Sequence, residues 1–282
     1  MNTYNPAVRI GNWNEDVSLS EDLLKDFLAK KERGELLIQK TSYLKKNLLQ
    51  KVNLSVSNDG FVHFGDTIML VNPGNEKVHL DSTDPPHGPL SLAINPEESK
   101  VHTCSSIEAP CGISAIQNLE PSVRNTFVIT SVDGTALGKP LLYGQNFALR
   151  TTEGFAGQLY LASDHKTFLK NAKKSRLQEI NLTNQYSYLT HWQVLYIDPQ
   201  FRMEYEGYPV HANANIIFDH CKTNQCLAVF SNYVLWTPYG KEYEVAVHTL
   251  LDSHKAERDV NHWLLVTGSP SGETTIVNKP GS

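Results

Sequence analysis

The chain has 282 residues, 40% of them hydrophobic, so it is long enough and apolar enough to form a sizeable packed core. Thirty acidic residues against 25 basic ones give a formal net charge of −5, which argues against general binding to nucleic acid or to a membrane surface. The sequence has no apolar run of about 18 residues and no secretory signal at its start. We therefore expect a soluble, intracellular protein with neither of these partners.

Residues 1 to 17 mix glycine, asparagine, proline and aspartate around Ile10 and Trp13. This composition predicts an extended arm, because the stretch is too short and too polar to bury its own apolar groups. Such an arm needs another surface to lie on. A buried position on a partner is the expected place for Trp13, and an arm that folds back over its own domain is the alternative.

A helix is expected to begin near Ser18 or Ser20, because Ser18 and Glu21 have the spacing of a capping box. Gly34 is its expected end, since glycine commonly follows the last helical turn. A second helical stretch should start at Glu35. Apolar residues of the first helix share one face, and these are Leu23, Leu24, Phe27 and Leu28.

The helical segment is basic, although the whole chain is acidic. Between residues 30 and 51, seven lysines and arginines stand against two glutamates, which gives a local charge of +5. A solvated helix face is the simplest interpretation, and an acidic partner is the functional one. Six residues of the arm and of this segment are the candidates for partner binding: Arg9, Ile10, Trp13, Lys40, Lys45 and Lys46.

From about residue 61, short alternating runs separated by turn residues replace the helical period, which is typical of antiparallel strands. Three of these runs place apolar residues three and five positions after Gly65, Gly144 and Asn213. These apolar pairs are Ile68 with Leu70, Phe147 with Leu149, and Ile216 with Phe218. Two more apolar strands follow each run, and each unit closes on a strand led by an aromatic residue, namely Phe127, Trp192 or Trp263.

Three successive four-stranded units can share one core by closing around a pseudo-threefold axis, which also removes exposed sheet edges. The repeats therefore predict an all-β protein whose residues 61–268 form a β-trefoil. Residues 1–60 would form the arm and helices, and residues 269–282 a flexible tail. A β-sandwich with accidental self-similarity is the alternative.

Possible metal ligands gather at His220, Cys221 and Cys226, with His248 or His254 as further candidates. Neighbouring strand residues point to opposite faces, so His220 and Cys221 could not easily meet at one ion. We predict no metal site, and interpret His220 as hydrogen-bonded to backbone. The four cysteines are too few for a disulfide scaffold and are interpreted as structural thiols: Cys104, Cys111, Cys221 and Cys226.

Catalytic motifs are not found in the sequence. Asp164-His165 and Asp252-Ser253-His254 invite a hydrolase interpretation, but no nucleophile elbow accompanies them, and polar turns are expected instead. The glycine-rich loops of nucleotide-binding proteins are missing too, so we predict no enzyme and no cofactor. A second basic run, residues 166–176, is interpreted as a solvated face.

Trefoil lectins carry a glutamine two residues before the closing tryptophan, and this signature is not present. The equivalent positions hold Asn125, Thr190 and Asn261. Trp192 and Trp263 are therefore expected in the core rather than at a sugar site.

Two sets of motifs resemble known families. Segments 160–165, 218–227 and 242–245 resemble the MIR-type trefoils of protein mannosyltransferases and of inositol-trisphosphate and ryanodine receptors. The whole chain more closely resembles the family of cilia- and flagella-associated protein 161. The motifs that carry this second resemblance are Val-Arg-Ile-Gly-Asn-Trp-Asn-Glu-Asp at 8–16, Ser-Asp-His at 163–165, Glu-Tyr-Glu-Gly at 204–207, Asp-His-Cys-Lys-Thr-Asn at 219–224 and Asn-His-Trp-Leu-Leu-Val-Thr-Gly at 261–268.

This resemblance implies a non-enzymatic microtubule inner protein of the cytoskeleton. It would lie in the lumen of the doublet microtubules of the axoneme, in motile cilia and flagella. Its partners would be tubulin and neighbouring inner proteins. A soluble trefoil module that binds a sugar or a phosphorylated small ligand is the alternative from a different functional class.

Overall fold

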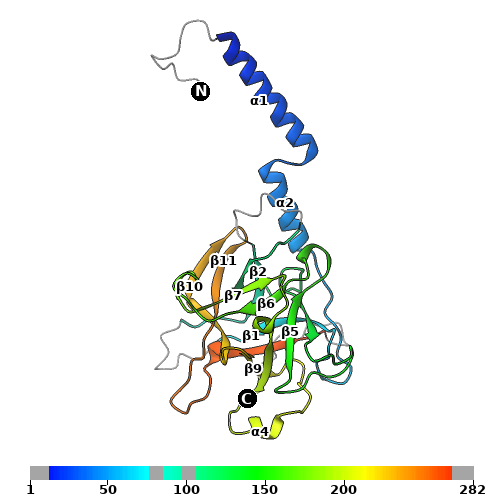
Figure 1. Cartoon of the computed structure of the whole chain (residues 1–282), viewed down its shortest axis with the longest axis vertical. Coiled ribbons are helices and arrows are strands. Elements are labelled where there is room, and N and C mark those ends of the chain that lie inside the picture. Colours follow the sequence, from blue (N-terminus) through cyan, green and yellow to red (C-terminus); the bar gives the residue numbers. More distant parts are fainter. Residues whose placement is uncertain (1–12, 76–84, 97–105, 269–282) are drawn as a thin grey trace.

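The computed structural model describes residues 13–75, 85–96 and 106–268. Figure 1 shows a strand-rich domain with two helices, α1 (Trp13–Arg33) and α2 (Leu37–Leu48), that lead away from one end of it. The strands of the described part are β1 (Thr67–Asn72), β2 (Leu90–Asn95), β3 (Cys111–Ile116), β4 (Phe127–Ser131), β5 (Asn146–Thr151), β6 (Tyr160–Ser163), β7 (Gln178–Thr183), β8 (Trp192–Tyr196), β9 (Asn215–His220), β10 (Gln225–Thr237), β11 (Gly240–Val247) and β12 (His262–Val266). Short helices complete the fold: η1 (Gly154–Ala156), η2 (Tyr188–Thr190), α4 (Arg202–Tyr205) and η3 (Asp259–Asn261).

Strand pairing follows a pseudo-threefold pattern. The first and fourth strands of each unit pair with each other, and the fourth strand also pairs with the first strand of the next unit. This closes a six-stranded barrel, β1-β4-β5-β8-β9-β12. The second and third strands form three hairpins whose third strands pair with one another, β3 with β7, β7 with β11, and β11 with β3. A barrel capped by a hairpin triplet is a β-trefoil, as the sequence predicted.

The register confirms the predicted alignment of the repeats. Ile68 pairs with Phe127, Phe147 with Trp192, and Ile216 with Trp263. All six predicted apolar residues of the first strands are fully buried in one core, together with both tryptophans. Closing the barrel brings these strands together, so each unit covers the apolar face of the others.

The residue that begins each unit has the same backbone role in all three. Gly65, Gly144 and Asn213 have φ of 94°, 77° and 58°. This left-handed region favours glycine, and asparagine tolerates it better than most residues. Their N–H groups donate to the carbonyls of Ile129, Val194 and Leu265, each two residues after the aromatic that leads a closing strand. The sequence offset therefore corresponds to a repeated turn.

Helix α1 starts earlier than predicted. It begins at Trp13, so residues 13–17 are helical, and the prediction of an extended arm is wrong for them. Glu15 and Asp16 explain the difference, because acidic residues in the first turn stabilise the positive end of the helix dipole. Gly34 follows the helix with φ of 75°, which confirms its predicted end.

Some predictions fall on residues that the structure does not describe. Arg9, Ile10, Cys104 and the tail at 269–282 lie outside the described residues. The domain boundaries at residues 60 and 268 remain predictions.

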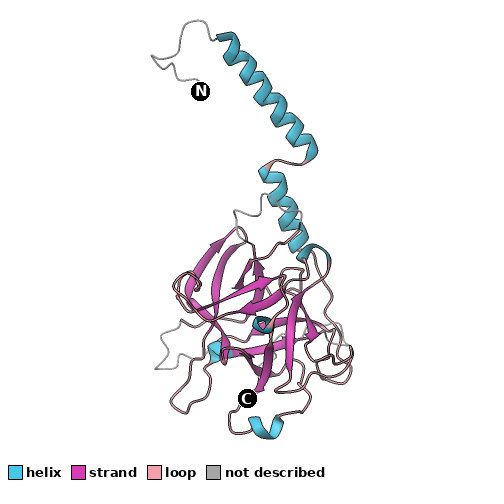
Figure 2. Cartoon of the chain, viewed as in Figure 1, coloured by secondary structure: helices cyan, strands magenta, loops and turns pink. Residues whose placement is uncertain are grey.

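Helix α2 is fixed to the trefoil. Leu44 and Leu48 are buried in the same core as the strands. Beyond the helix end, the N–H of Arg124 donates to Leu48 O at 3.0 Å, and the N–H of Val123 donates to Gln50 O at 2.9 Å. Figure 2 shows α2 standing on the strands and α1 continuing beyond it. The trefoil therefore holds α1 out on a rigid base.

Candidate partner-binding site

Helix α1 carries an apolar face that the described part of the chain leaves exposed. We define the α1 face as Val17, Leu23, Leu24, Phe27 and Leu28, whose side chains lie on one side of the helix at spacings of three, four and seven. Their exposed fractions run from 40% for Val17 to 62% for Leu23. Such a stripe is usually buried against another element. The α1 face is therefore the candidate surface for binding a partner.

Charged residues of α1 pair within the helix. Lys30 Nζ lies 2.6 Å from Asp26 Oδ2, and Lys25 Nζ lies 3.5 Å from Asp22 Oδ1. These pairs stabilise an isolated helix only slightly, by about 0.3–0.5 kcal/mol each. In proteins most of the stability of a helix comes from packing of its apolar face. Contact with a partner through the α1 face is thus the expected source of its stability.

The three candidate lysines of α2 lie on different sides of the helix. Lys45 Nζ is 5.8 Å from the ring centroid of Tyr239, so this side chain lies against the trefoil. Lys46 is exposed, and Lys40 is half-buried. Successive helical residues are about 100° apart, which prevents these three positions from forming one patch. Trp13 opens α1, so the candidates on described residues belong to two helices.

The local excess of positive charge is partly balanced within the chain. Lys30 pairs with Asp26, and Lys51 Nζ lies 3.4 Å from Glu120 Oε2. Since exposed ion pairs contribute little and are screened by salt, an attraction to an acidic partner from this segment is expected to be modest.

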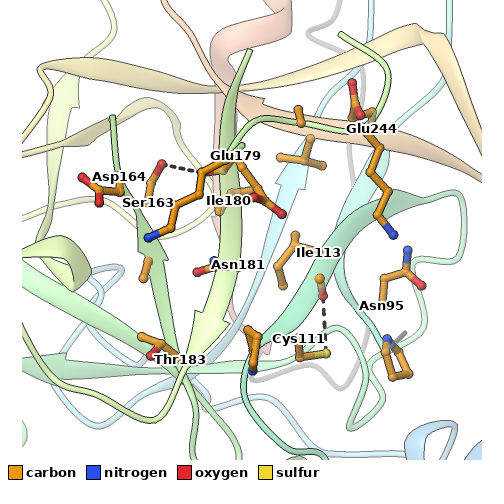
Figure 3. Close-up of a pocket in the computed structure, with 18 of the residues that line it drawn as sticks. Asn95, Cys111, Ile113, Ser163, Asp164, Glu179, Ile180, Asn181, Thr183 and Glu244 are labelled. Carbon is orange, nitrogen blue, oxygen red and sulfur yellow. Dashed lines mark hydrogen bonds between the residues drawn. The ribbon is translucent and has the colours of Figure 1, made fainter. Parts of the chain in front are cut away.

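A cleft of about 850 Å³ opens over the trefoil cap (Figure 3). Strands β3, β6, β7 and β11 supply its floor, and the segment between β6 and β7 supplies one rim. Labelled side chains around it include Asn95, Ser163, Glu179, Asn181 and Glu244. The sequence did not predict this cleft, because its lining comes from all three repeats.

The charged groups of the cleft are mostly engaged. Asp164 Oδ1 lies 3.3 Å from Lys222 Nζ, and the Glu244 carboxylate accepts two backbone N–H bonds at 2.8 Å. Burial raises the pKa of Glu179, while Lys173 and Lys170 act in the opposite direction. The Ser163 hydroxyl donates to the carbonyl of Glu179 at 2.7 Å. Its proton is held by a backbone oxygen rather than by a base, so Ser163 is not arranged as a nucleophile.

Candidate metal ligands around His220 have other partners. His220 Nε2 lies 3.0 Å from Leu189 O, which is the predicted bond to backbone, and Nδ1 lies 2.8 Å from Thr223 Oγ1. Burial raises the pKa of the Cys221 and Cys226 thiols to about 12, which keeps them protonated at neutral pH. Within residues 13–75, 85–96 and 106–268, no three potential ligands cluster.

The two Asp-His motifs are polar turns, as predicted. Asp164 Oδ1 accepts the backbone N–H of His165 at 2.8 Å. Asp252 Oδ1 accepts the backbone N–H groups of His254 and Ala256 at 2.8 and 2.9 Å. These carboxylates shape the loops in which they lie.

The three positions that replace the lectin glutamine have a structural role. Asn125 Oδ1 accepts the N–H of Ser122 at 2.8 Å, and Asn261 Oδ1 accepts that of Leu250 at 2.9 Å. Thr190 is buried as well, and its hydroxyl donates to the carbonyl of Ser187 at 2.7 Å. They hold loops in place and are not accessible to a sugar.

His220 should make the stability of the trefoil depend on pH. Burial lowers its pKa below the ordinary 6.5, so the unfolded chain takes up a proton here at a higher pH than the folded chain. This histidine is therefore expected to cost no stability above about pH 6.5 and to destabilise the fold progressively below it. Urea denaturation at a series of pH values measures the slope. His220→Gln should make the free energy of unfolding less dependent on pH, whereas the control His165→Gln should leave this dependence unchanged. The same pH dependence in His220→Gln and in the parent would contradict this expectation.

The structure describes no helix long and apolar enough to span a membrane within its three described ranges. The fold defines a class of protein: a β-trefoil that carries a helix with an exposed apolar face. A family model for the cilia- and flagella-associated protein 161-like domain matches residues 40–268. The chain belongs to the cilia- and flagella-associated protein 161 family, which confirms the resemblance seen in its motifs.

Relatives of that name align with nearly the whole chain. The Danio rerio cilia- and flagella-associated protein 161 is 51% identical over 278 residues, covering 96% of this chain and 90% of the relative. The Bos taurus protein is 50% identical over 281 residues, covering 99% and 87%. A solved Caenorhabditis elegans structure, described as a protein with unknown function, is 15% identical, covers 75% of this chain and 98% of its own, and has a TM-score of 0.51. This last likeness concerns the fold alone.

Proposed function

We propose that the chain is a structural, non-enzymatic inner protein of ciliary and flagellar doublet microtubules. It binds tubulin at the lumen of the doublet and links it to neighbouring inner proteins in the axoneme. Membership of a family named for cilia and flagella supports the location. The binding role rests on one observation: the α1 face is exposed, while the next helix, α2, is packed into the trefoil core.

The rigid base makes this arrangement suitable for joining two surfaces. Leu44 and Leu48 fix α2 to the trefoil, so a partner bound along α1 is held at a defined place relative to the strand domain. Contacts of the trefoil with a second partner then act together with those of α1, because each raises the effective concentration of the other.

The alternative, a soluble trefoil that binds a sugar or a phosphorylated ligand, has less support. The residues at the lectin positions, Asn125, Thr190 and Asn261, are buried, and their side chains bond to backbone groups of Ser122, Ser187 and His248. Lys170 and Lys173 line the cleft, but they interact with the carboxylate of Glu179. The negative charge of this carboxylate would oppose the binding of an anionic ligand in the cleft.

Electron cryo-microscopy of intact axonemes tests the proposal directly. We expect density for a trefoil with a two-helix extension inside the doublet lumen, with α1 in contact with a neighbouring chain. We also expect the purified chain to bind immobilised tubulin dimers. Density confined to the outside of the doublet would contradict the luminal location. Specific binding in a glycan or phosphoinositide array without tubulin binding would favour the alternative.

Changing the α1 face should weaken binding without unfolding the trefoil. Leu24→Gln with Phe27→Gln removes two exposed apolar anchors, and glutamine keeps a good helix propensity. We expect at least tenfold weaker binding to ciliary doublets, since a buried anchor typically contributes more than about 1.4 kcal/mol. Co-sedimentation measures the affinity, and the urea midpoint checks the fold.

Asp22→Gln on the opposite side of α1 is the matched control and should bind like the parent chain. Equal affinity of the Leu24→Gln/Phe27→Gln variant and this control would show that α1 does not contact the doublet. The candidates Trp13, Lys40, Lys45 and Lys46 can be tested in the same assay.

A further inference from the structure

The segment between β6 and β7 exposes two large apolar side chains at its tip. We define the basic loop as residues 165–176. Phe168 is 96% exposed and Leu169 is 90% exposed. Single exposed apolar residues are common, but two adjacent ones at such exposure lose the full benefit of burial. A surface that covers them would recover it.

The basic loop is held in one conformation by its own hydrogen bonds. The N–H of Thr167 donates to Lys170 O at 2.9 Å, and the N–H of Lys170 donates to Thr167 Oγ1 at 3.0 Å. Asn171 Nδ2 donates to the carbonyls of Thr167 and Phe168 at 3.1 and 3.0 Å. The tip therefore presents Phe168 and Leu169 at little further cost in conformational entropy when a partner binds.

The base of the basic loop is anchored to the trefoil. The backbone N–H groups of Lys174 and Ser175 each donate to the buried carboxylate of Glu244 on β11 at 2.8 Å. Ala172 is buried against a small apolar cluster that includes Phe230. These contacts explain how a loop of this composition stays close to the strands.

Positive charge surrounds the apolar tip. The sequence from 165 to 178 contains no acidic residue, and its five basic ones are Lys166, Lys170, Lys173, Lys174 and Arg176. The nearest carboxylates are already engaged or face lysines. Asp164 pairs with Lys222, and Glu179 lies within the influence of Lys173 and Lys170. An acidic surface complements this field.

We propose that the basic loop is a second docking surface, which inserts Phe168 and Leu169 into an apolar pocket on an acidic protein. The inference rests on the proposed function, under which that protein is tubulin. Lys170 and Lys173 also line the cleft over the cap, where Trp236, 77% exposed, forms part of the lining. The same partner therefore covers the loop tip and reaches the cleft, with Trp236 as a further aromatic contact.

Binding to tubulin dimers immobilised on a biosensor tests the inference, because dimers leave the luminal face open to solution. Phe168→Ser with Leu169→Ser should weaken binding at least tenfold while leaving the urea midpoint unchanged. Met203→Ser is the matched control, since Met203 is 89% exposed on α4, at the end of the molecule opposite α1 (Figure 1). It should bind like the parent.

A second pair of variants tests the charge. Lys166→Gln with Lys174→Gln should make the affinity less dependent on salt, because fewer exposed charges take part. Lys139→Gln, at an exposed position outside the basic loop, is the control.

Three outcomes would overturn the inference. If the parent chain binds tubulin and the Phe168→Ser/Leu169→Ser variant binds equally well, the basic loop is not a docking surface, and the proposed function stands. If the parent does not bind tubulin, both fail. If the parent instead binds phosphatidylserine vesicles and the same variant does not, the loop docks on a membrane surface and not on a protein.

Discussion

Replacing Trp263 with alanine is expected to lower the free energy of unfolding by about 3–5 kcal/mol, as for other large-to-small changes in a core. Trp263 is fully buried, and its Nε1 donates to Leu227 O at 3.0 Å. The substitution therefore leaves a cavity and removes one of the two side-chain hydrogen bonds to this carbonyl, since Asn261 Nδ2 also donates to it at 3.1 Å. Trp192→Ala should have an effect of the same size, because Trp192 is also fully buried, donates to Leu161 O at 2.9 Å and stacks on Phe218 at 5.0 Å.

Urea denaturation followed by far-ultraviolet circular dichroism measures these losses without relying on tryptophan fluorescence. Trp236→Ala is the control, since Trp236 is exposed and should cost less than about 0.5 kcal/mol. A loss below about 1 kcal/mol for Trp192→Ala or Trp263→Ala would mean that these rings do not fill the core of the folded protein in solution.

The trefoil could be predicted because its signal is local and repeated. Each unit places a left-handed residue, Gly65, Gly144 or Asn213, at a fixed distance before two apolar residues, and the period of two identifies the buried face. Register then follows, because only one pairing buries all three faces at once. Sequence signals for helix boundaries are weaker than this repeat. The predicted start of α1 near Ser18 or Ser20 is therefore wrong, whereas its predicted end at Gly34 is correct.

The candidate surfaces could be predicted only in part. Sequence periodicity indicated an apolar stripe on α1, but it does not say whether the same chain covers that stripe. In the sequence Lys45 is one of several unpaired positive charges. The fold places it beside Tyr239, a residue nearly 200 positions further along the chain. The basic loop is visible in the sequence as a charged run, but its base is fixed by long-range bonds to Glu244, and the exposure of Phe168 and Leu169 follows only from the folded structure. Contacts between residues that are far apart along the chain produce no local sequence pattern from which they could be predicted.

One such contact is a buried ion pair beneath α2. Arg124 Nη2 lies 2.6 Å from Glu242 Oε1, with the two side chains 3% and 2% exposed. Ser114 Oγ donates to the other carboxylate oxygen at 2.6 Å, and Arg124 Nε donates to Ile94 O at 2.7 Å. The guanidinium also lies 3.9 Å from the ring centroid of Tyr239. This network joins β2, β3 and β11 below the base of the helix.

Glu242→Ala is expected to destabilise the fold by about 3–5 kcal/mol, because it leaves the Arg124 guanidinium buried without its counter-charge. Arg124→Leu with Glu242→Leu removes both charges and should recover much of that loss, since paired buried charges contribute little net stability. Urea denaturation of the two variants and the parent measures the difference. A loss below about 1 kcal/mol for Glu242→Ala would mean that water reaches the guanidinium.

The same variants separate stability from binding. The backbone N–H of Arg124 donates to Leu48 O at the end of α2, so the ion pair also fixes the base from which α1 projects. If that base matters, the Arg124→Leu/Glu242→Leu variant should fold well yet bind ciliary doublets more weakly than the parent, because the Arg124 side chain no longer holds this segment against β2 and β11. Unchanged binding by a stably folded double variant would show that the backbone bonds and the burial of Leu44 and Leu48 suffice to position α1.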